Sequence, residues 1–118
     1  MQVLDKKTNQ VLVSDLEIAK TPWQRFRGLM LRKNFRNGYG LILSPCSSVH
    51  TMWMRSAIDI YFISQDTVIV DRRLRVKPWR IAIPSAPCSM VLELPNAARE
   101  LEVGTKLSIQ NDNGVQVL

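Results

Sequence analysis

The stretch that decides the fold runs from residue 46 to residue 63 and reads CSSVHTMWMRSAIDIYFI. It contains the only histidine of the chain and one of its two cysteines. If residues 46–54 form a strand, their side chains alternate between two faces. One face then carries Cys46, Ser48, His50, Met52 and Met54. Residues 58–63 read as a buried strand. We therefore expect this stretch to cross the middle of a sheet.

Turn and strand signals on both sides of this stretch predict further strands. Short apolar runs bounded by turn residues lie at residues 3–4, 11–13, 41–43, 67–70 and 89–94. Alternating residues around Asn113-Gly114 predict a C-terminal hairpin with a type I′ turn. Because tight turns join most of these strands, we predict a mainly β (α+β) fold. Its core is expected to be a compact antiparallel sheet curled toward a barrel, with one or two short helices.

The clearest helix signal begins at Thr21-Pro22-Trp23-Gln24. Thr21 can cap the helix, Pro22 suits the first turn, and Gln24 completes a capping box. The helix is expected over residues 23–31, with Trp23, Phe26 and Met30 on one stripe. Gly28 inside it indicates a close backbone approach. A second short helix is expected at residues 96–101, capped by Asn96.

Three prolines interrupt residues 76–88 at positions 78, 84 and 87. Proline has no amide hydrogen for a sheet ladder, so we expect an irregular excursion along the surface. Loops of this length usually pack on something or have a function.

Length and composition place limits on the protein class. The 118 residues fit a single domain, 1–118. No segment approaches the roughly 20 apolar residues of a membrane helix, so we expect a soluble protein with no membrane partner. The N-terminus lacks the features of a secretory signal. We expect a cytoplasmic protein, with export possible if a signal segment was removed.

The formal charge of +6 favours anionic partners without identifying one. Ten basic residues form two clusters: Arg25, Arg27, Arg32, Lys33 and Arg36, and then Arg72, Arg73, Arg75, Lys77 and Arg80. No recognisable nucleic-acid-binding motif accompanies them. We interpret the clusters as a solvated basic surface and do not expect a nucleic-acid partner.

The thiol, imidazole and thioether groups of Cys46, His50, Met52 and Met54 suit Cu(I). Donors four residues apart on a strand lie ~13 Å from each other, however, which is too far to chelate one ion. We therefore expect no metal and no cofactor, and we interpret these residues as a core stripe. Cys46 with His50 could also act as nucleophile and base. Cys46 and Cys88 each follow a proline and could meet if their loops lie together.

Charged residues inside apolar segments are further candidates. Arg27 and Asp59 each lie in such a segment, where a buried charge needs a partner. We predict an ion pair between them, with a ligand site as the alternative. Trp53 and Trp79 could line a pocket. Glu93 is expected to face away from Leu92 and Leu94, into solvent, with pairing to an arginine as the alternative.

Ordered blocks of the sequence resemble a known family pattern. They are Arg27-Gly28-Leu29-Met30, Trp53-Met54-Arg55 ahead of Ile58-Asp59, Val91-Leu92-Glu93-Leu94, and Gly104. Over residues 12–109 the chain resembles the domain of unknown function 192 family. The resemblance implies a compact, mainly β domain, found in bacteria and archaea, with no established activity; we expect a bacterial source. Residues 50–57 depart from the family's usual aromatic and Asn-Thr block, so ligand contacts from that segment are not carried over.

These observations lead to a binding or interaction module without enzymatic activity as the main hypothesis. Its ligand is expected to be a small polar molecule or a protein segment, held between the central stretch and residues 76–88. The candidate ligand-binding residues are Arg27, Cys46, His50, Trp53, Met54, Asp59 and Cys88. The alternative hypothesis is a thiol- or metal-dependent enzyme that uses Cys46 and His50.

Overall fold

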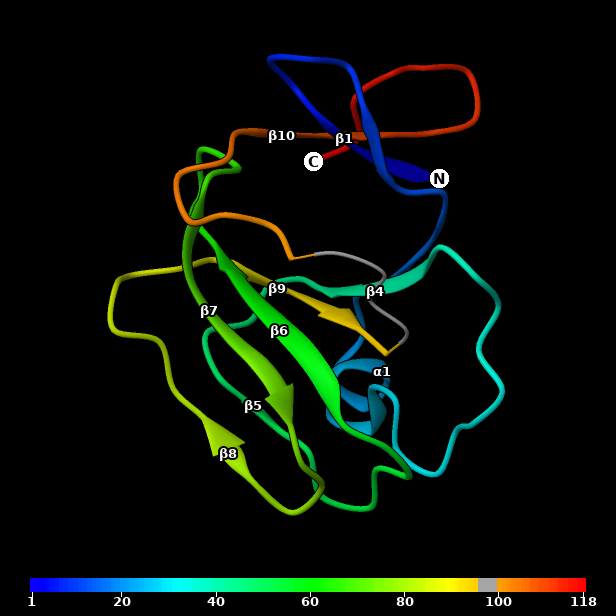
Figure 1. The fold of residues 1–118 in the computed structure, drawn as a ribbon, viewed down its shortest axis with the longest axis vertical. Coiled ribbons are helices and arrows are strands. Elements are labelled where there is room, and N and C mark those ends of the chain that lie inside the picture. The colour runs from blue at the N-terminus through cyan, green and yellow to red at the C-terminus, as the bar shows by residue number, and fades with distance from the viewer. Residues whose placement is uncertain (96–99) are drawn as a thin grey trace.

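The computed structural model describes residues 1–95 and 100–118. Within these ranges the strands form a five-stranded, a three-stranded and a two-stranded sheet, with one short helix (Figure 1). The strands are β1 (Gln2–Asp5), β2 (Val11–Val13), β3 (Asp15–Ala19), β4 (Tyr39–Leu43), β5 (Val49–His50), β6 (Ile58–Ile63), β7 (Ile69–Val76), β8 (Ile81–Ala82), β9 (Met90–Leu94) and β10 (Leu107–Gln110). The helix is α1 (Pro22–Arg27). The prediction of a mainly β fold is confirmed.

The five-stranded sheet has the order β3-β4-β9-β6-β7 and is buried on both faces. Alternate residues of its strands enter two separate cores, as the two-residue period of a strand requires. Ile42, Tyr61 and Leu92 pack with residues of the three-stranded sheet β10-β1-β2. Leu43 and Phe62 pack on the opposite face, toward Leu29 and Val49. A side chain on either face of β9 is therefore enclosed.

Most strand pairs are antiparallel, as expected, but β3 and β4 pair in parallel with α1 between them in the chain. The tight turns expected between consecutive strands form the antiparallel hairpins β1–β2 and β6–β7. The sheets curve around the two cores, although no closed barrel is found among the described residues. The predicted helix at residues 96–101 falls largely on residues 96–99, outside the described ranges.

The N-terminal cap of α1 forms as predicted. The side chain of Thr21 accepts a hydrogen bond from the Gln24 amide, and the Gln24 side chain accepts one from the Thr21 amide. The helix is shorter than expected, because the chain turns at Gly28 with a φ of 47°. None of the six helical residues is buried. The aromatic part of the predicted stripe therefore faces solvent and not the core.

The first half of the central stretch does not cross a sheet, and that prediction is wrong. Only Val49–His50 is a strand, and it pairs with β8 in the two-stranded sheet. β8 lies inside the proline-rich excursion, so that segment is not wholly irregular as predicted. The predicted type I′ turn is also wrong, because Gly114 has a positive φ and Asn113 does not.

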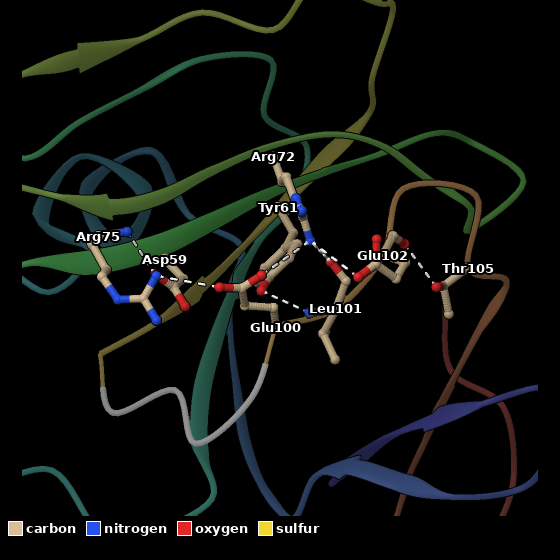
Figure 2. A network of polar contacts seen from close by, with 8 residues as sticks. All are labelled: Asp59, Tyr61, Arg72, Arg75, Glu100, Leu101, Glu102 and Thr105. Carbon is tan, nitrogen blue, oxygen red and sulfur yellow. Dashed lines mark hydrogen bonds and ion pairs between the residues drawn. The ribbon is translucent and has the colours of Figure 1, made fainter.

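A polar network holds the chain on either side of residue 101 against β6 and β7 (Figure 2). The amide of Leu101 donates to the buried Tyr61 hydroxyl at 3.0 Å, and the carbonyl of Leu101 accepts from Arg72 at 2.8 Å. Asp59 accepts a hydrogen bond from the Arg75 amide at 2.7 Å, where the β6–β7 pairing is irregular. Asp59 is thus a structural residue of this network.

Candidate functional site

A cavity of about 260 Å³ lies between α1, β4, β9 and the chain leading through β5. Its walls are mainly apolar, and a few polar groups project into it. Segments far apart in the sequence meet there: Gly28 after the helix, Cys46, His50, Met54, and Glu93 on β9. Three of the blocks that carry the family resemblance therefore supply residues to one cavity.

Glu93 is the most unusual residue of this cavity. Its side chain is only 1% exposed, and among the described residues its Oε1 atom has no hydrogen-bond partner. Burial raises the pKa of Glu93 to about 8, because the low-dielectric surroundings disfavour the charged form. At neutral pH the carboxyl is therefore mostly protonated and can donate a hydrogen bond.

The expectation that Glu93 is solvated is wrong. Glu93 does point away from Leu92 and Leu94, but that face of β9 is covered by α1 and β5. A single charged residue inside the apolar run Met90–Leu94 was the available signal. The sequence does not reveal that both faces of the strand are buried.

Gly28 gives the cavity its depth next to Glu93. A Cβ atom at this position would lie 3.3 Å from Glu93 Oε1 and 4.0 Å from a methyl carbon of Leu43. The positive φ of Gly28 also disfavours any residue with a side chain. The close backbone approach expected at Gly28 is thus confirmed, and it leaves Oε1 uncovered.

His50 lines the cavity with both ring nitrogens engaged. Nδ1 lies 3.2 Å from the Met52 amide nitrogen, and Nε2 lies 3.2 Å from the Phe26 carbonyl oxygen. Because the amide can only donate, Nδ1 must accept, and Nε2 must carry the proton that it donates to the carbonyl. These two contacts fit the Nε2–H tautomer of His50 and tie β5 to α1.

Cys46 lines the cavity, and Cys88 lies close to Cys46. Cys46 Sγ donates to the Ser48 carbonyl at 3.1 Å, while Cys88 Sγ lies 3.7 Å from the Cys46 carbonyl oxygen. Both cysteines are free. Burial raises the pKa of both thiols, so neither is activated as a thiolate.

The predicted ion pair between Arg27 and Asp59 does not form. Arg27 is exposed at the end of α1 and lines the cavity, whereas the buried Asp59 pairs with the Arg75 amide. Of the predicted ligand-binding residues, the cavity brings together Arg27, Cys46, His50 and Met54. Asp59 and Cys88 do not line it.

Trp53 contributes to a second, shallower pocket beside the cavity. Phe26, Ser48, Val49 and His50 line both spaces, and Met30, Met52 and Ile81 join Trp53 in the second one. Met52 and Met54 therefore serve different pockets, because the chain turns after His50. Within the described residues, no three His, Cys, Asp or Glu side chains are grouped so that they could hold a metal ion.

A family model described as DUF192, Uncharacterized ACR, matches residues 3–109 of the chain. The chain belongs to the DUF192 family. This confirms the predicted family and extends the resemblance toward the N-terminus. The family description assigns no activity to the cavity.

Two archaeal relatives carry the name UPF0127 protein. One, from Pyrococcus furiosus, is 38% identical over 93 residues, which cover 71% of this DUF192 chain and 77% of the relative. Another, from Thermococcus sibiricus, is 31% identical over 97 residues, which cover 79% of this chain and 62% of the relative. The chain thus spans less than two thirds of the second relative. Neither relative confirms the expected bacterial source.

The fold has a counterpart among solved structures. A Novosphingobium aromaticivorans protein of unknown function superposes with a TM-score of 0.77 at 22% identity, covering 92% of this DUF192 chain and 82% of the other. Identity at this level supports the fold alone. In the described part of the chain, no helix combines the length and apolar character needed to cross a membrane.

Proposed function

We propose that this DUF192 protein is a binding module that holds a small ligand in the cavity over Glu93. The observation that carries the proposal is the enclosed carboxyl group whose Oε1 has no partner among the described residues. An unsatisfied buried polar group is costly, and such groups in native proteins call for an explanation. A ligand that bonds to Glu93 would satisfy the group.

The shape and chemistry of the cavity support a small ligand with an apolar body. Its volume of about 260 Å³ is at the lower end for small-molecule sites. Leu43, Val49 and Met54 offer apolar walls, and the carboxyl of Glu93 offers a directional polar contact. Few polar groups on apolar walls are typical of sites that bind and orient a ligand.

The same geometry favours binding over thiol catalysis. A nucleophilic cysteine needs a base beside it or a lowered pKa. The pKa of Cys46 is raised by burial, and both nitrogens of His50 already have backbone partners. To act as the base, His50 would have to give up its contact with Phe26 or Met52 before it could accept a proton from Cys46.

A ligand screen tests the proposal. Small amides, amines and carboxylic acids with matched carbon skeletons are compared by protein-observed NMR on the wild type and on Glu93→Gln and Gly28→Ala. We expect hits that shift cavity resonances and weaken in Gly28→Ala, because its methyl group enters the cavity beside Glu93. The proposal fails if the amides, the amines and the carboxylic acids all leave the cavity resonances unshifted. It also fails if the compounds bind the wild type, Glu93→Gln and Gly28→Ala equally well.

A further inference from the structure

A second surface lies next to the cavity and is not used by the proposed function. It is an exposed apolar groove of about 360 Å³, bounded by Phe26, Met30, Met52, Trp53 and Ile81. Trp79 packs on Trp53 with a ring-centroid distance of 4.8 Å, and each of these tryptophans is 54% exposed. We name this surface the tryptophan groove. Large exposed apolar patches usually mark interaction sites.

The backbone holds both tryptophans outward in an unfavourable conformation. Trp53 has a φ of 61° and Trp79 a φ of 68°. Bulky residues rarely adopt positive φ angles, and such strain persists only where surrounding contacts enforce it. Burial of the indoles does not explain the strain, because both rings are solvent-exposed. The strained backbone instead holds both indole rings at the surface.

Thr51 enforces this arrangement. Its fully buried hydroxyl donates to the Lys77 carbonyl at 2.6 Å and accepts from the Arg80 amide at 2.8 Å. Its carbonyl accepts from the Trp79 amide at 3.0 Å. The two loops that carry the tryptophans are therefore fastened together. Such a preorganised surface loses little conformational entropy when it binds.

The two chain segments that supply the residues of the tryptophan groove carry charge of one sign. Residues 20–58 contain seven Lys and Arg residues, and residues 72–92 contain five. Neither segment contains an Asp or a Glu; the next acids in the chain are Asp59 and Glu93. Several of the twelve form ion pairs with acids from elsewhere in the chain, for example Arg32 with Glu17. Around the groove, Arg27, Arg55 and Lys77 have no acidic partner among the described residues.

We propose that the tryptophan groove binds an acidic segment of a partner protein that inserts one or two large apolar side chains. The apolar walls would receive those side chains. Arg55 and Lys77, which are exposed two residues from Trp53 and Trp79 in the chain, would attract the neighbouring carboxylates. Tryptophan is enriched among residues that dominate protein interfaces. Methionine side chains such as Met30 and Met52 adapt to different partner shapes.

Two other anionic partners fit the groove less well. A bilayer presents a broad surface, and its lipids would leave the recessed walls between Phe26 and Ile81 without close contact. Single-stranded nucleic acid stacks bases on open aromatic faces, whereas Trp53 and Trp79 are inclined at 60° against each other. Among the described residues, the groove walls offer few polar groups for base recognition, namely Ser48, His50 and the indole N–H of Trp53.

A random twelve-residue peptide display library tests the proposal. The immobilised 118-residue chain selects binding peptides. Peptides that also bind the double variant Trp53→Ser/Trp79→Ser are removed. We expect the remaining sequences to be enriched in Asp and Glu together with Leu, Phe or Trp. Synthetic copies should bind the double variant at least about tenfold more weakly, as interface tryptophans require. Their affinity should also fall as salt is raised.

Control variants separate the groove from folding effects and from the cavity. Val115→Ser removes an exposed apolar side chain in the segment after β10. This segment lies at the opposite end of the molecule from β5 and β8 (Figure 1), so the variant should leave peptide affinity unchanged. Arg55→Glu/Lys77→Glu keeps both tryptophans and should abolish the preference for acidic peptides. Glu93→Gln should have no effect on peptide binding, so failure of the cavity proposal would not affect this one.

Three outcomes would overturn the proposal. The first is that no selected peptide binds the wild type more tightly than it binds Trp53→Ser/Trp79→Ser. The second is enrichment of basic or uncharged sequences. The third is tryptophan-dependent binding to phosphatidylcholine–phosphatidylglycerol vesicles or to oligothymidylate in place of peptides, which would assign the groove to a membrane surface or to nucleic acid.

Discussion

At the scale of single residues, Glu93 links the cavity to the stability of the protein. Folding transfers its carboxyl from water to an enclosed site, and burial raises the pKa to about 8. The folded state therefore keeps the proton over a pH range in which the unfolded state has released it. Stability from this group is fully present below the unfolded pKa and is lost as pH rises toward the folded value.

We predict that the free energy of unfolding of the wild type falls by about 3–5 kcal/mol between pH 5 and pH 9 relative to Glu93→Gln. The amide of glutamine does not ionise, so the variant lacks this loss. Urea unfolding of both proteins across this pH range measures the difference. Parallel pH profiles for the two proteins would show that Glu93 is not buried as a neutral acid.

Asp71 is a carboxylate with the opposite behaviour. Burial opposes its ionisation, but hydrogen bonds from Arg73, Ser85 and the Arg72 amide outweigh burial and lower the pKa of Asp71. Its stabilising effect is therefore present above the unfolded pKa and is lost as pH falls through the lower folded value.

We predict that Asp71→Asn lowers the free energy of unfolding by about 2 kcal/mol at pH 7, since a charged acceptor is lost. The difference from the wild type should shrink as the pH is lowered below about 4, where the unfolded carboxyl becomes protonated. Thermal unfolding from pH 7 to pH 2 measures it. A difference that grows toward low pH would contradict this assignment.

At the scale of elements, the pair β5–β8 shows how a two-residue strand is maintained. Val49 and His50 pair with Ala82 and Ile81, which is too short a ladder to be stable alone. The hydroxyl of Thr51 adds side-chain hydrogen bonds directly after β5. The element therefore depends on one buried side chain more than on strand propensity.

We predict that Thr51→Val destabilises the protein by about 2 kcal/mol, because it leaves the Lys77 carbonyl and the Arg80 amide without their partner. Valine nearly matches threonine in shape, so packing should be retained. Chemical unfolding measures the loss, and hydrogen exchange at the Arg80 amide should become faster. An unchanged exchange rate at this amide would mean that the hydroxyl does not hold the two loops.

At the scale of the whole molecule, the three-stranded sheet is joined to the five-stranded sheet partly through the chain around Leu101. That residue packs in the first core, and its amide is fixed by Tyr61 from β6 (Figure 2). Arg72 on β7 bonds to the carbonyl of the same residue. The chain that leads into β10 is thus anchored on the large sheet before it crosses to the small one.

We predict that Tyr61→Phe lowers the free energy of unfolding by about 1–2 kcal/mol, since the buried Leu101 amide loses its acceptor. The ring and its packing are retained. Denaturant unfolding measures the change, and hydrogen exchange at Leu101 should quicken more than exchange within β9. Equal acceleration at both places would indicate general destabilisation without loss of this anchor.

The sequence by itself determined the mainly β fold, several strands and the cap of α1. Each of these depends on local chemistry: a nearly continuous apolar run at β6, a proline-started capping box at Thr21, and turn residues between β6 and β7. Family membership was also readable, since its blocks are contiguous in the chain. Gly28 was identified as a point of close approach because glycine is otherwise unfavourable there.

Only the tertiary structure decided which residues meet. Glu93 looked like a solvated residue, but α1 and β5 cover its face of β9. Arg27 and Asp59 looked like a pair, but Arg27 is exposed at the end of α1, and Asp59 accepts its hydrogen bond from the Arg75 amide. Trp53 and Trp79 come together because Thr51 fastens two loops. Burial and pairing depend on contacts between distant segments, and local sequence does not encode where those segments will lie.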